Sequence, residues 1–107
     1  MNIRLSNSAL RIRLSKMDVA ALASGGDVSL IFAPVPGPTL CFRLKLADDQ
    51  SENLKLTYDD SVSILWIAKH AFLDLEQRLP SREGIQEQGV NAQNQAYTLI
   101  LEVDLRK

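Results

Sequence analysis

The chain has very few of the residues from which metal and disulfide sites are built. Cys41 is its only cysteine and His70 its only histidine. One cysteine excludes an intrachain disulfide and a cysteine-rich zinc site, and a reducing cytoplasm is the expected location. No glycine-rich loop precedes a helical pattern, because Gly25 and Gly26 follow one, so a phosphate-binding loop is not indicated. We therefore expect no metal and no cofactor.

Long apolar runs are also missing. They reach no more than five residues, as in ILWIA at 64–68, whereas a helix that crosses a bilayer needs about 20 apolar residues. The first residues alternate between apolar and polar side chains, while a secretory signal has an uninterrupted apolar core. We therefore expect neither a membrane span nor a signal peptide.

What the chain does contain is ordinary for one soluble globular domain. Hydrophobic residues make up 46% and charged residues 23% of the 107 residues, a balance that argues against intrinsic disorder. A chain of this length buries roughly 60 to 70% of its unfolded surface. No repeat or linker marks a boundary, so we predict a single domain over residues 1–107.

Charge is close to balanced overall but unevenly distributed. The formal net charge is −1. Residues 1–46 carry six basic and two acidic side chains, a net +4, whereas residues 47–107 carry six basic and eleven acidic side chains, a net −5. The basic half can therefore use the acidic half of its own chain as a partner.

Alternating apolar and polar residues predict most of the strands. Residues 2–15 form two strands joined at Asn7-Ser8, with Arg4 opposite Arg11. Ser15 and Asp18 then fit a capping box for a helix over 16–23 that ends at Gly25-Gly26. Further strands are predicted at 27–32, 39–47, 54–58 and 97–105, with a proline-rich turn at 33–38. Residues 81–96 read as a loop, with room for a short strand near Ile85.

The segment from Val62 to Leu75 is the hardest to assign, because ten of its fourteen residues are apolar. One helix there would be apolar nearly all round. We favour a split into a strand over 61–67 and a helix over 68–79 that Pro80 ends. The predicted fold is then α+β, a mainly antiparallel, curved or barrel-like sheet of six to seven strands. Two helices cover its apolar face, in the order β-β-α-β-β-β-β-α-β.

Four arginines are the candidate binding residues. Like charges opposite each other in a ladder repel, so something must neutralise the outward-facing Arg4, Arg11, Arg13 and Arg43. Guanidinium groups suit carboxylate or phosphate. Glu102 and Asp104, two apart on the last strand, can do this within the fold, as can the helix with Asp74 and Glu76. A protein partner, a second copy of the chain or a bound anion are the other readings. Six aromatic residues in all disfavour nucleic acid.

No catalytic set can be assembled. On one helix, Ser63 and His70 would lie about 10 Å apart along the axis, beyond hydrogen-bond reach. A structural pair of His70 with Asp74, at i and i+4, is the expected alternative. Cys41 shares a strand face with two cations but has no base at a recognisable spacing, so it reads as a packing residue. We expect no enzyme.

The opening residues NIRLSNSALRIRLSKMDVAALASGGDV resemble a family of small bacterial proteins of unknown function. Its members begin with a pattern such as K-I-R-I-x-x-N-S-L-R-L-R-L, followed by a short helix and a glycine. The likeness continues through SILWIAKHAFLDL and GIQEQ to the last strand, where the family tends to read V-E-K-D-F and this chain reads LEVDL. The resemblance implies a bacterial source and a shared fold, with no catalytic residues to carry over.

These observations favour a small, soluble, non-catalytic interaction or adaptor protein of the cytoplasm. Its expected partner is another protein or a second copy of the chain, met through an exposed strand edge. The alternative is a module that binds an anion through the arginine face.

Overall fold

Eight strands and two helices make up the fold in the computed structural model, which describes residues 1–34, 36–37 and 39–104. Part of the predicted turn over 33–38 lies outside these residues. Leu105, the last apolar position of the predicted final strand, also lies outside them. The elements are β1 (Asn2–Leu5), β2 (Ala9–Leu14), α1 (Lys16–Ala23), β3 (Val28–Phe32), β4 (Leu40–Ala47), β5 (Leu54–Asp59), β6 (Val62–Ala68), α2 (Lys69–Arg78), β7 (Ile85–Val90) and β8 (Ala96–Val103).

The strands form two four-stranded sheets built on one plan. The first sheet has the order β1-β2-β8-β7 and the second the order β3-β4-β6-β5. In each sheet two antiparallel hairpins meet through a parallel pair of inner strands, β2 with β8 and β4 with β6. The β1–β2 register is as predicted, with Arg4 opposite Arg11.

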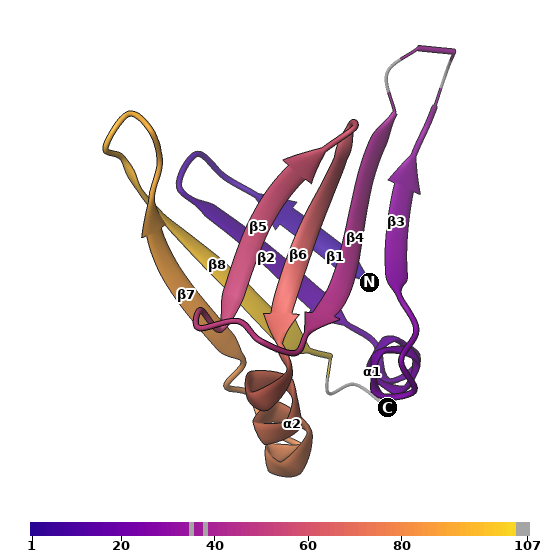
Figure 1. Ribbon diagram of the computed structural model, residues 1–107. Helices are drawn as coiled ribbons and strands as arrows, with labels where there is room; N and C mark the ends of the chain where they lie inside the picture. The colour runs from indigo at the N-terminus through magenta and orange to yellow at the C-terminus, as the bar shows by residue number, and fades with distance from the viewer. Residues whose placement is uncertain (35, 38, 105–107) are drawn as a thin grey trace.

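The predicted α+β class is confirmed, and four of the six strand pairings are antiparallel. A single curved or barrel-like sheet is wrong, since the strands form two open, mixed sheets. The true element order is β-β-α-β-β-β-β-α-β-β. The additional strand is β7, which lies in the segment predicted as a loop. Nor do the helices cover a sheet: both lie beyond the ends of the strands, at the bottom of the view in Figure 1.

The two sheets bury their inner faces against each other. The first sheet contributes Leu10, Ile12, Leu14, Ile85, Leu99, Leu101 and Val103, and the second contributes Val28, Leu44, Leu54, Leu65 and Ile67. Leu22 from α1 and Phe72 and Leu75 from α2 close the end of this core. Apolar alternation thus predicted the buried faces of β2, β4 and β8 correctly, because only one face of each sheet is covered.

The first helix begins at the predicted capping box. The Ser15 hydroxyl accepts from the Asp18 backbone N–H at 3.1 Å, and the Asp18 carboxylate accepts from the Ser15 N–H at 2.9 Å. Partial burial raises the pKa of Asp18. The hydrogen bonds with Ser15 and the ion pair with the Met1 ammonium group lower this pKa by a larger amount, so the net shift is downward. After the helix, Gly25 adopts φ +88°, a conformation that glycine takes without strain.

The apolar segment 62–75 does split into a strand and a helix. β6 continues directly into α2, and its inner residues Leu65 and Ile67 are buried. The helix ends at Arg78, just before Pro80, as predicted. Because β6 pairs with β4 on one side and β5 on the other, it is an inner strand of the second sheet.

Candidate functional site

Three of the four candidate arginines share the outer face of the first sheet. The parallel register of β2 and β8 places Arg13 beside Glu102. One Glu102 carboxylate oxygen lies 3.2 Å from Arg13 Nη2 and 3.7 Å from Arg11 Nη1. The expected neutralisation by Glu102 is confirmed for these two side chains. Arg4 forms no ion pair with any residue in the described ranges.

Arg43 does not belong to this face. It lies on β4 in the second sheet, where its Nε donates to the Ser29 hydroxyl at 3.3 Å. The grouping of Arg43 with Arg4, Arg11 and Arg13 is therefore wrong, because alternation shows which way a side chain points but not which sheet carries its strand.

The residues considered for catalysis are dispersed. Ser63 lies on β6 and His70 on α2. Asp74 pairs with Arg78, at 2.9 Å, instead of forming the expected pair with His70. Cys41 is half-buried on the outer face of the second sheet. Among the described residues, no three His, Cys, Asp or Glu side chains are placed to hold a metal ion.

The outer face of the second sheet is apolar at its centre. On β6 the outward positions are Val62, Ile64 and Trp66, and Cys41 on β4 is the direct neighbour of Val62. This face is turned toward the viewer in Figure 1, and no helix or strand of the described residues lies over it. The outward face of an antiparallel sheet is normally polar. A strand that is apolar on both sides is typical of a sheet whose two faces are both covered. We call this surface, Cys41, Val62, Ile64 and Trp66, the outer platform.

Cations flank Trp66 and Ile64 on the outer platform, and one carboxylate, Asp59, is the neighbour of Val62 at its other end. Lys45 and Lys55 are the register neighbours of Trp66 on either side, and Arg43 is the neighbour of Ile64. Lys45 Nζ lies 5.8 Å from the centre of the Trp66 ring, within the range of a cation–π contact. The indole N–H of Trp66 donates to the Thr57 hydroxyl at 2.9 Å, which fixes the ring on the sheet.

These cations are only weakly neutralised by the chain itself. Lys45 Nζ lies 3.9 Å from an Asp27 carboxylate oxygen, and both side chains are partly exposed to solvent. Arg43 meets a hydroxyl and not a carboxylate. Lys55 forms no ion pair within the part of the chain that the structure describes. The surface is therefore an apolar centre with a net positive rim.

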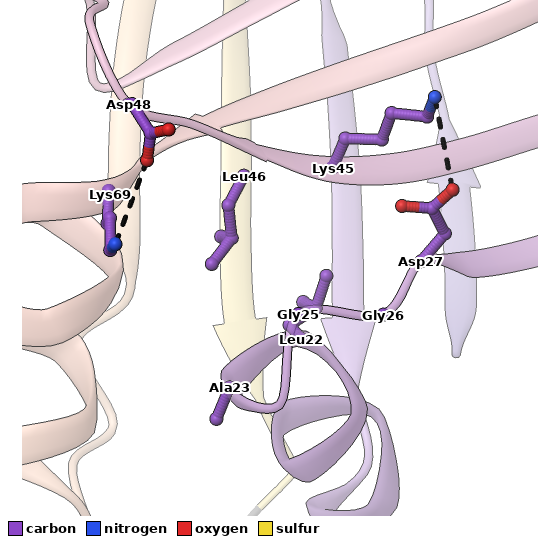
Figure 2. A pocket seen from close by; sticks show the side chains of 9 residues that line it. All are labelled: Leu22, Ala23, Gly25, Gly26, Asp27, Lys45, Leu46, Asp48 and Lys69. Carbon is purple, nitrogen blue, oxygen red and sulfur yellow. Dashed lines mark ion pairs between the residues drawn. The ribbon is translucent and has the colours of Figure 1, made fainter.

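A cavity of about 290 Å³ lies between the end of α1, the end of β4 and the start of α2. Figure 2 shows Lys45 next to Asp27 on one side and Lys69 next to Asp48 on the other, with Leu22 and Leu46 between them. The two ion pairs measure 3.9 and 3.7 Å. Each cation here faces its own carboxylate, so the cavity presents no unmatched charge to a ligand.

The sequence reasoning overlooked the outer platform, although the sequence carries its signal. The run from Val62 to Ala68 is apolar at six of seven positions, a pattern typical of strands covered on both faces.

No helix in the described ranges is both long and apolar enough to cross a membrane.

Comparison with known proteins places the chain at the level of a family. A family of unknown function, DUF7009, matches residues 1–106. The chain belongs to this family, and the predicted kinship with a family of unknown function is confirmed. No curated protein and no solved structure matches the chain significantly.

Proposed function

We propose that the protein is a small non-catalytic interaction protein of the bacterial cytoplasm that binds another protein through the outer platform. The observation that carries this proposal is the apolar outward face of β6, where Val62, Ile64 and Trp66 are half-buried and no helix or strand of the described residues lies over them. Contiguous exposed apolar surface rimmed by polar groups is typical of protein interaction sites.

The composition of the surface indicates the chemistry of the partner. Tryptophan and arginine are enriched at the residues that dominate binding energy, and here Trp66 lies on the platform between Lys45 and Lys55 while Arg43 lies at its rim. The rim cations Arg43, Lys45 and Lys55 favour a partner with carboxylates around an apolar contact, because complementary charge speeds association and excludes wrong partners. The expected ligand is therefore a protein segment with apolar side chains flanked by Asp or Glu.

Selection from a displayed library of bacterial peptides tests this function. We expect wild-type protein to enrich peptides with apolar residues next to acidic ones. Trp66→Thr, which keeps a strand-forming residue, should bind the selected peptides at least about tenfold more weakly, the loss expected for a central anchor residue. Because the rim acts through charge, the selected complexes should also weaken as salt rises.

The matched control is Val90→Thr, which changes an exposed apolar residue on a strand of the other sheet. It should bind the selected peptides as the wild type does. Circular dichroism establishes that both variants are folded. Failure to enrich any peptide, or equal binding by Trp66→Thr and wild type, contradicts the proposal.

A second candidate function rests on Arg4, which forms no ion pair with the residues that the structure describes. Arg11 and Arg13 share the Glu102 carboxylate, and Arg4 on the neighbouring strand adds a third guanidinium group to the same face, which leaves excess positive charge for a small anion. Phosphate or a dicarboxylate at 100 times its dissociation constant should raise the free energy of unfolding by about 2.7 kcal/mol. Thermal unfolding with and without each anion measures this.

Arg4→Gln should lose that stabilisation, while Arg43→Gln, on the other sheet, should keep it. Equal gains in all three proteins would mean that the anion acts on the solvent or on other cations, and the arginine face would not be a site. No gain in the wild type would exclude the tested anions.

A further inference from the structure

The two open sheets leave four edge strands: β1, β7, β3 and β5. Proteins protect such edges from pairing with other chains by placing charges on them. β1 carries Arg4, β5 carries Lys55 and Asp59, and β7 carries Glu87. Among these four edges in the described part of the chain, β3 alone, with the sequence VSLIF, contains no charged residue.

The unprotected edge is also apolar and exposed. Ile31 is 64% exposed and points to the outer side, whereas Phe32 is 57% exposed and points to the inner side. Leu40, the neighbour of Phe32 on β4, is 58% exposed. Figure 1 shows β3 at the right margin of the second sheet, with no strand beyond it. An edge of this kind is a template for an additional strand.

The β3 sequence is complementary to itself. In an antiparallel pair centred on Leu30, Val28 of one copy lies opposite Phe32 of the other, and Ser29 lies opposite Ile31. Because residues directly opposite point to the same face, the inner residues Val28, Leu30 and Phe32 stay together. The register of β3 with β4 then gives one unbroken inner row, Leu44, Val28, Phe32 of the second copy and Leu40 of the second copy.

Charge favours a second copy at β3 over a second copy at β1 or β7. A two-fold axis through an edge strand brings that strand close to its own copy, so any charge near the axis meets a like charge, which destabilises the pair. Arg4 on the short β1 and Glu87 on β7 impose this repulsion on their edges. On β5 a pair centred on Thr57 sets Lys55 opposite Asp59, so that edge differs from β3 in carrying charges and not in repelling its own copy. β3 imposes none, and Asp27, just before it, lies opposite the uncharged Ala33 of the second copy in this register.

We propose that the protein forms a homodimer in which β3 pairs antiparallel with β3 of a second copy, centred on Leu30, so that the two second sheets join into one eight-stranded sheet. This inference rests on the β3 edge and not on the outer platform, so it stands or fails separately from the proposed function. If both hold, the dimer presents two outer platforms on one continuous face.

Analytical ultracentrifugation of the full chain between about 1 and 100 μM, the range of moderate-affinity dimers, tests the proposal. We expect a dimer in the wild type. Ile31→Lys places like charges beside the axis at an exposed position and should raise the dissociation constant at least about tenfold. The matched control, Val90→Lys on the edge strand β7, is 60% exposed in the wild type and should leave the dimer unchanged.

The register is tested by restoring complementary charge. In Ser29→Glu/Ile31→Lys, each new lysine lies opposite a new glutamate of the second copy, so dimerisation should recover by about tenfold relative to Ile31→Lys alone. A wild-type monomer throughout the concentration range overturns the proposal. A dimer that Ile31→Lys leaves intact, or a double variant as monomeric as the single one, overturns the β3 pairing.

Discussion

Replacing Phe72 by alanine should lower the free energy of unfolding by about 3 to 5 kcal/mol, the usual loss for a buried phenylalanine. The Phe72 side chain is 1% exposed and belongs to the cluster that closes the end of the core. α2 has no side-chain cap at its N-terminus, so packing must supply most of what holds it against the sheets. Thermal or urea unfolding measures the loss, which corresponds to a fall in Tm of about 20 °C.

The neighbouring residue provides the control. Leu73 lies on the same helix but is 46% exposed, and alanine is the stronger helix former. Leu73→Ala should therefore change the free energy of unfolding by less than about 1 kcal/mol. Similar losses in the two variants would show that α2 is not held by the core, and the packing described for the end of the two sheets would be wrong.

Local pattern predicted the parts of this fold that local physics determines. Each alternating strand faces the core with its apolar side, and the hairpin register that sets Arg4 opposite Arg11 follows from a short turn between two matched strands. The helix over Lys16–Ala23 begins and ends at its capping residues, Ser15 and Gly25. These features depend on residues only a few positions apart.

Strand neighbours that are distant in sequence were beyond the reach of such patterns. β2 pairs in parallel with β8, which places Arg13 beside a glutamate 89 residues away. The alternation of apolar and polar residues cannot distinguish one curved sheet from two facing sheets, because in both folds one side of a strand packs on the core. The grouping of Arg43 with the other arginines failed for this reason, whereas pairing by Glu102 was predictable from charge alone.

Only the start of β7, near Ile85, was indicated by the sequence, because the other inner positions of this strand are not apolar. Only Ile85 follows the strand pattern, and the next inner residues are Glu87 and Gly89. The Glu87 carboxylate accepts a hydrogen bond from the Asn53 backbone N–H at 2.7 Å, so it links the first sheet to the second. A polar inner residue with a specific backbone partner stabilises the contact without contributing to hydrophobic periodicity.

Gly84→Ala should be nearly as destabilising, with an expected loss of about 2 to 3 kcal/mol, at the upper end of the range for overpacking. Gly84 lies just before β7, where an added Cβ would collide with the carbonyl oxygen of Leu101 and stand 3.0 Å from the Cα of Glu102. These are backbone atoms of β8, so no side-chain rotation can relieve the clash. The start of β7 would have to move away from β8. This movement would disturb the packing of buried Ile85 and the strand position of Glu102.

Gly89 near the other end of β7 is the matched control. There an added Cβ would meet only the outer ring atoms of Tyr97, a half-buried side chain that can turn aside. Gly89→Ala should therefore cost no more than about 1 kcal/mol, measured by the same urea unfolding. If Gly84→Ala were as mild as Gly89→Ala, β7 would not be held tightly against β8. If it is the more severe variant, the glycine is required by close strand packing, and the position of Glu102 between Arg11 and Arg13 depends on it.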